Sequence, residues 1–208
     1  MGIRILSKIA GYSYLIIFLA AIFANFGVIE NIGDDPLLFI ENNTLLFKLG
    51  IVAFLVTVVF DVVVAWALQE LYKNQTLSLL STFFRLSHAI IMGIAIFKLL
   101  EVLDFNSNEE ILINLKAFNR IWLIGLLFFG IHLILLGRIA KANTFIKWFL
   151  ILAGVCYMLD TLAYFILPNY EDVASVFLIL VATTSIIGEM SFAFWLITEH
   201  GKEKYTQG

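Results

Sequence analysis

An arginine and a histidine lie in the middle of a long apolar run, and they are the residues of this sequence that most need a chemical explanation. Arg85 and His88 are one helical turn apart within residues 77–103. A charged side chain near the centre of a lipid bilayer costs roughly 2.5–3.5 kcal/mol, so it normally faces the protein interior and pairs with an anion. We therefore expect Arg85 to have an acidic partner on another segment of the chain.

Other apolar runs are also interrupted by ionisable side chains. These are Asp61, His132, Asp160 and Glu189. At a helical rise of about 1.5 Å per residue, Asp61, Arg85 and Glu189 come to similar depths, within one or two turns. We expect these three to meet in one polar centre in the cytoplasmic half of the membrane, with His132 joining from the cytoplasmic side.

The spacing of neighbouring residues adds two further members to this centre. Tyr157 and Asp160 share one face of a helix, because they are three residues apart. The estimated depth of Asp160 is nearer the outer side of the membrane, where we expect it to contact His88. In the first apolar run, Asn25 is the polar residue considered for this centre, and the neighbouring residues include several alanines. We therefore expect this helix only to pack against the others.

The composition limits the class of protein. Of the 208 residues, 62% are hydrophobic and 14% are charged. Soluble domains have about 45–50% apolar and about 25% charged residues, so a soluble globular protein is excluded. The net charge is -3 and there is no basic patch, which argues against direct binding of nucleic acid. The sequence predicts an all-α polytopic membrane protein whose main partner is the lipid bilayer.

Six apolar runs are long enough to cross the bilayer, which takes about 20 residues. We expect them at residues 9–29, 45–71, 77–103, 111–139, 145–167 and 175–198, forming one domain over residues 1–208. The first run follows Arg4 and Lys8 as in a signal peptide, but it is too long for a signal core and is expected to stay as a helix. Pro168 should end the fifth helix.

The distribution of lysine and arginine predicts the orientation. Eight of these residues fall on the side of the two termini and four on the other side. Cytoplasmic loops carry the excess of Lys and Arg. Both termini are therefore predicted to be cytoplasmic.

Two long passages resemble a known family. The first is FDVVVAWALQELYKNQTLSLLSTFFRL, and the second is GIHLILLGRIAKANTFIKWFLILAGVCYMLD followed by GEMSFAFWLI. They resemble a family of bacterial six-helix membrane proteins known as domain of unknown function 4386, over most of the chain from the second helix on. The motif positions in this sequence are Asp61, Arg85, His132, Gly137, Gly154, Tyr157, Asp160, Glu189 and Trp195.

The resemblance implies an architecture and a location in the bacterial inner membrane, but no reaction. The family usually has a tyrosine after the glycine at position 137 and a proline in the following loop. This chain has Arg138 and no such proline, so the match in that loop is weaker than in the helices.

Three interpretations of the polar centre stay open, and whether the protein is an enzyme stays open with them. The centre is a structural charge network that fixes the helices, or it binds or moves a small anionic or lipidic ligand whose anion is held by Arg85. The third interpretation is a metal-dependent intramembrane enzyme, hydrolase-like, with a metal ion as its cofactor. Its candidate ligands are His88, His132, Asp160 and Glu189. Haem ligation by the two histidines is a smaller variant of this third interpretation.

Overall fold

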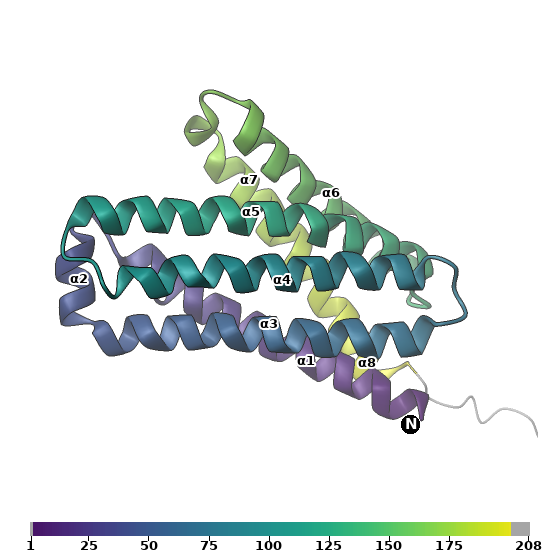
Figure 1. Ribbon diagram of the computed structural model, residues 1–208. Coiled ribbons are helices and arrows are strands. Elements are labelled where there is room, and N and C mark those ends of the chain that lie inside the picture. The colour runs from purple at the N-terminus through teal and green to yellow at the C-terminus, as the bar shows by residue number, and fades with distance from the viewer. Residues whose placement is uncertain (1, 201–208) are drawn as a thin grey trace, which may run out of the picture.

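The computed structural model describes residues 2–200 and consists of helices joined by short links (Figure 1). The first three long helices are α1 (Ile3–Phe26), α3 (Thr44–Tyr72) and α4 (Ser78–Val102). They are followed by α5 (Asn108–Ile139), α6 (Thr144–Ile166) and a last span that runs from Ala174 to Thr198. All six are long and apolar enough to cross a membrane, which confirms the predicted fold class. The protein is a membrane helical bundle.

The bounds lie close to the predicted spans, and the differences have local causes. α1 begins at Ile3, six residues earlier than expected, so Arg4 and Lys8 lie within the helix and not before it. The guanidinium of Arg4 donates hydrogen bonds to the carbonyl oxygens of Ile197 (2.5 Å) and His200 (2.8 Å), where the last span ends. These bonds satisfy carbonyl groups that have no partner within their own helix.

Side chains at the loop ends explain where several helices begin. The short helix α2 (Pro36–Asn42), which the sequence reading did not foresee, has Asp35 as its cap and proline at its first position. Ser107 accepts a hydrogen bond from the Glu110 backbone N–H (3.3 Å) and donates to its carboxylate (2.8 Å), so α5 starts with a serine N-cap. α6 ends at Ile166, just before Pro168, as predicted.

The last span is not a uniform α-helix. It consists of α7 (Ala174–Ser185), a π-helical turn η3 (Ile186–Met190) and α8 (Ser191–Thr198). A π-helical turn widens the helix locally and often occurs at functional sites. Glu189 lies within this turn.

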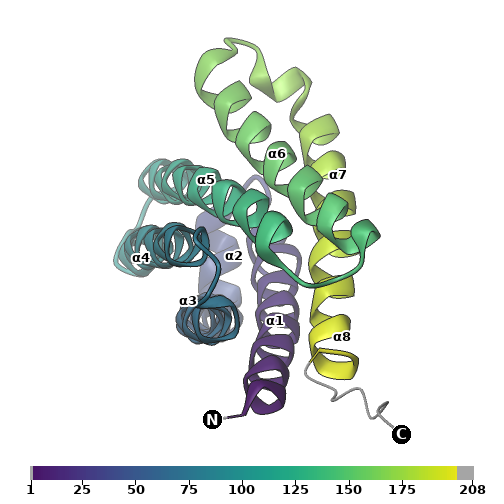
Figure 2. The same ribbon diagram turned by 90° about the vertical axis from the view of Figure 1, so that its right-hand side faces the viewer.

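The helices pack as neighbours in sequence, and α1 also packs against α8, which closes the bundle at one end. Figures 1 and 2 show that α6 and α7 lean away from the other helices toward the end opposite the termini. α7 packs mainly against α6, and Thr184 is its only buried residue. The described ends of the chain, at residues 2 and 200, lie at the same end of the bundle (Figure 2).

Two glycines allow α5 and α6 to approach closely. A Cβ atom on Gly130 of α5 would lie 2.6 Å from the carbonyl oxygen of Gly154 on α6. Small residues at helix interfaces let backbones come together in this way, which gives helices in a membrane their packing energy. This contact holds α6 beside the polar residues of α5.

Candidate functional site

Arg85 is the most buried charged side chain of the site, with 1% of its surface exposed. Its Nη2 donates to Asp61 Oδ1 of α3 at 2.5 Å, and its Nη1 donates to the Tyr14 hydroxyl of α1 at 2.8 Å. The predicted pairing of Arg85 with an acid on another helix is therefore found, and Asp61 is the partner. A charge-assisted hydrogen bond of this kind is among the strongest available to a side chain.

Aromatic rings cover the guanidinium on two sides. Its Cζ lies 4.7 Å from the ring centroid of Tyr14 and 5.2 Å from that of Phe129. The faces of aromatic rings carry negative potential and attract cations, more strongly where water is excluded. The charge of Arg85 is thus satisfied by one carboxylate and two rings.

His132 of α5 lies between Arg85 and Ser81 and uses both ring nitrogens. Its Nε2 is 3.2 Å from Arg85 Nη1, and since a guanidinium can only donate, Nε2 must accept. The proton is then on Nδ1, which donates to the carbonyl oxygen of Ser81 at 3.0 Å and lies 2.9 Å from its hydroxyl. His132 is therefore a neutral member of the network, with neither nitrogen free for a metal ion or a haem.

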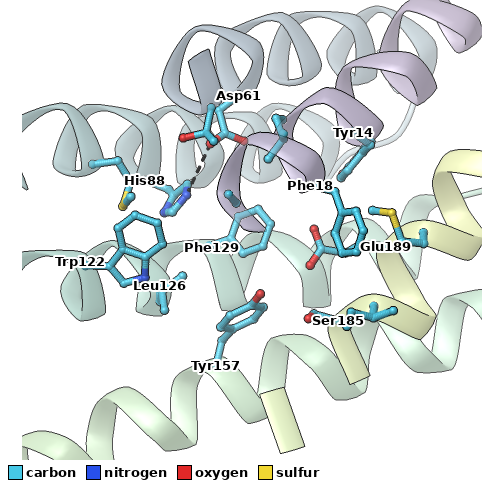
Figure 3. A pocket seen from close by; sticks show the side chains of 16 residues that line it. Tyr14, Phe18, Asp61, His88, Trp122, Leu126, Phe129, Tyr157, Ser185 and Glu189 are labelled. Atoms are coloured by element: carbon cyan, nitrogen blue, oxygen red, sulfur yellow. Dashed lines mark ion pairs between the residues drawn. The ribbon is translucent and has the colours of Figure 1, made fainter. Parts of the chain in front are cut away.

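A cavity of about 140 Å³ lies next to this network and is lined by residues of all six spans (Figure 3). Asp61, His88, Tyr157 and Glu189 reach its surface, whereas Arg85 and His132 do not line it. The network and the cavity thus share Asp61, whose second oxygen Oδ2 lies 3.5 Å from His88 Nε2. Figure 3 shows this contact on the side of the cavity away from Glu189.

Two side chains of the cavity lining have polar atoms without protein partners. Glu189 is half-buried and makes no hydrogen bond and no ion pair with the other described residues. The Nδ1 of His88 is buried without a hydrogen bond within residues 2–200, and it lies against Gly125 of α5. Most polar groups inside proteins are paired, so the carboxylate of Glu189 calls for a partner from outside the chain.

Comparisons with known proteins match most of the chain. Residues 9–199 match the family described as domain of unknown function (DUF4386). The chain belongs to this family. An uncharacterised protein of Archaeoglobus fulgidus is 30% identical over 159 residues, which cover 74% of this chain and 85% of the relative. No solved structure matches the chain.

Five of the polar positions that carried the resemblance in the sequence lie in two parts of the fold. Asp61, Arg85 and His132 belong to the network, whereas Tyr157 and Glu189 are on the other side of the cavity. The expected direct meeting of Glu189 with Arg85 does not occur, because no ion pair joins them. Glu189 lies in the π-helical turn of the last span, whose α7 part leans away with α6.

The expected contact between Asp160 and His88 is wrong. Asp160 is 8% exposed and does not line the cavity; its Oδ1 accepts a hydrogen bond from the Tyr170 hydroxyl at 2.7 Å. Burial, and then the bond to Asp160, raise the pKa of the Tyr170 hydroxyl, which keeps it a donor. This pair closes the turn between α6 and α7, and the tilt of α6 carries it away from the network.

The four residues considered as metal ligands do not come together. Among residues 2–200, no group of three or more His, Cys, Asp or Glu side chains is placed to hold a metal ion. Asp160 is bonded to Tyr170, and both nitrogens of His132 are used. The described residues therefore give the metal-dependent interpretation no site.

Tyr14 is the functional residue that sequence reasoning missed, because the first helix was expected only to pack. Ser7, Gly11 and Tyr14 are buried on one side of α1. A tyrosine that follows small residues at one-turn spacing lies on a face where another helix comes close. That spacing was the available signal that the Tyr14 hydroxyl reaches the interior.

Proposed function

We propose that this protein binds a small lipophilic molecule within the membrane, in the cavity between the network of Arg85 and the turn that carries Glu189. The observation that carries the proposal is that Glu189, a carboxylate with no hydrogen bond or ion pair among the described residues, lines a mostly apolar cavity together with His88. Concave, mostly apolar sites with a few convergent polar groups are typical of ligand binding. The polar atoms would orient one end of the ligand.

The depth and surroundings of the cavity favour a ligand that comes from the lipid phase. Glu189 is nine residues from Thr198, or about 14 Å along the span. Ile186 lines the cavity and is also 46% exposed on the apolar surface of the bundle. An opening at Ile186 would face hydrocarbon, so a ligand could enter sideways without crossing water.

The cavity volume limits the part of the ligand that is enclosed. A cavity of about 140 Å³ is close to the roughly 150 Å³ that accommodates benzene. The enclosed part is then a small head group, and a longer apolar tail would extend past Ile186 into the lipid.

Arg85 has a positioning role in this proposal and does not hold the ligand. Its terminal nitrogens are spent on Asp61, Tyr14 and His132, and it does not line the cavity. Its Nε is buried without a partner among the described residues, but Arg85 lies behind the cavity wall, where an anion in the cavity does not meet it. The network instead holds one oxygen of Asp61 and leaves the other 3.5 Å from His88 Nε2.

We also infer an orientation with both termini in the cytoplasm of the inner membrane. The end of the bundle that holds residues 2 and 200 also holds Arg4, Lys73 and Arg138, and the opposite end is rich in acids. Cytoplasmic loops are enriched in Lys and Arg. A cysteine placed at Gln75 should react with a membrane-impermeant maleimide only when the reagent is on the cytoplasmic side. A cysteine placed at Asn106, in a loop at the opposite end, should react only from the outside.

The binding proposal is tested by extracting the small molecules that co-purify with the protein in native-membrane discs. Ala21→Phe places a ring in the cavity, whereas Leu19→Phe places the same ring on the exposed side of α1. The proposal expects a compound that accompanies the unchanged protein and Leu19→Phe and is lost with Ala21→Phe. Identical extracts from all three, with all three folded, would contradict it.

A further inference from the structure

The aromatic side chains of the cavity indicate which kind of head group it would take. Phe18, Trp122 and Tyr157 line the cavity, and none of them is in contact with a cation among the described residues. Figure 3 shows them distributed around the cavity, with Trp122 near His88 and Phe18 near Glu189. Rings arranged around a space without water attract an ammonium group through the negative potential of their faces.

The charges around the cavity point the same way. Two carboxylates, Asp61 and Glu189, line it, and the lining contains no lysine or arginine. Arg85 lies behind the wall and is paired with Asp61. Within residues 2–200, an ionised Glu189 therefore has no cationic partner within 4.0 Å, and an unpaired charge in an apolar interior is strongly unfavourable. A cationic ligand would supply the missing charge.

Elsewhere in the bundle, a carboxylate and aromatic rings already bind one cation, the side chain of Arg85. The guanidinium of Arg85 lies between the rings of Tyr14 and Phe129 and is paired with the carboxylate of Asp61. Around the cavity, Glu189 and the rings of Phe18, Trp122 and Tyr157 supply the same kinds of group, a carboxylate and aromatic faces, but no cation of the described residues contacts these rings.

From these contacts we propose that the cavity binds the ammonium group of a lipophilic organic cation, with Glu189 as its counter-ion and Phe18, Trp122 and Tyr157 as the surrounding rings. The proposal rests on the proposed function and names its ligand class. The apolar tail of the ligand lies toward Ile186 and the lipid.

The experiment compares three probes of equal tail length in maltoside micelles, with bound molecules counted by native mass spectrometry. The probes are dodecyltrimethylammonium, its neutral isostere 2,2-dimethyltetradecane and the anion dodecyl phosphate. We expect the cation to bind at least tenfold more tightly than the isostere. Glu189→Gln should remove this preference, and Phe18→Leu should weaken cation binding about fivefold.

Asp160→Asn is the matched control, because Asp160 is a carboxylate within the spans that does not line the cavity. It should leave the preference for the cation unchanged. The proposal is overturned if the isostere or the anion binds as tightly as the cation, or if Asp160→Asn and Glu189→Gln act alike.

The outcome separates the ligand class from the binding function itself. If the co-purifying compound of the extraction experiment is neutral or anionic, binding stands and the ammonium proposal fails. If Ala21→Phe changes neither the extract nor the binding of any probe, both fail together.

Discussion

Two carboxylates on opposite sides of one cavity have contrasting surroundings. Asp61 is bonded to Arg85 at 2.5 Å and lies 3.5 Å from His88, in a region where Tyr14 and His132 complete the contacts of the guanidinium. Glu189 has no such partner among the described residues and lies in a π-helical turn of a span that leans outward.

The contrast separates two uses of polar groups inside a membrane. A charge that the chain neutralises itself fixes how helices pack, because removing either partner leaves the other unpaired. A carboxylate without a partner contributes little to packing, and its presence is explained by what it binds. We therefore assign structure to Arg85 and ligand binding to Glu189.

The largest expected effect is the loss of stability in Arg85→Leu. Asp61 would be left as a buried carboxylate without its guanidinium, and breaking one half of a buried pair costs about 3–5 kcal/mol. Denaturant unfolding in micelles, followed by circular dichroism, measures the change in the free energy of unfolding.

The double variant Arg85→Leu with Asp61→Leu is the matched control. It removes both charges, and the free energy of unfolding should recover by more than half of the loss. If the double variant is less stable than Arg85→Leu alone, the pair is not the unit that fixes these helices.

Tyr14→Phe should have the next largest effect, since it removes one hydroxyl from the network and keeps the ring over the guanidinium. The Arg85 Nη1 atom loses its 2.8 Å hydrogen bond, and a bond to a charged group contributes roughly 1.5–3 kcal/mol. Tyr12→Phe, on the exposed side of the same helix, is the control and should change the free energy of unfolding by less than about 0.5 kcal/mol.

Gly130→Ala tests the helix contact that positions α6 beside the cavity. The new Cβ would meet the backbone oxygen of Gly154 at 2.6 Å, and overpacking of this kind costs about 1–3 kcal/mol. At Gly93 of α4 nothing lies within 4 Å of the added atom. Gly93→Ala should therefore be neutral or stabilising by up to about 1 kcal/mol, and equal losses in both variants would contradict the close contact.

Glu189→Gln should have the smallest effect on stability, within about 0.5 kcal/mol of the unchanged protein. No hydrogen bond or ion pair among the described residues is lost, and the shape of the side chain is kept. The same unfolding measurement checks this expectation. A loss as large as that in Arg85→Leu would mean that Glu189 is a structural partner, and the contrast between the two carboxylates would disappear.

The spans and the pairing of Arg85 could be predicted from the sequence because both follow from the cost of placing polar groups in hydrocarbon. The length of an apolar run fixes a span to within a few residues, and the cost of the guanidinium requires an acid such as Asp61. Depth along a straight helix was a poorer guide for Asp160. The tilt of α6 and the short turn at Tyr170 determine its partner, and neither leaves a pattern in the sequence.

The cavity was also beyond prediction, for a related reason. It exists because α6 and α7 lean away from the other helices, and because η3 widens the last span at Glu189. The residues that line it were visible as ionisable and aromatic side chains on separate runs. Which of these side chains join the network of Arg85 and which line the cavity depends on the angles between the helices. The hydropathy of the sequence does not predict those angles.

Residue-resolved labelling with a hydrophobic carbodiimide tests the central claim most directly. The reagent dissolves in the lipid phase and modifies a carboxylic acid that it can reach in protonated form. Digestion and mass spectrometry then report the modified residues. In protein freed of bound ligand, where no cation offsets a charge on Glu189, the account predicts modification of Glu189, none of Asp61, and loss of the label in Glu189→Gln. Modification of Asp61 with Glu189 untouched would contradict it.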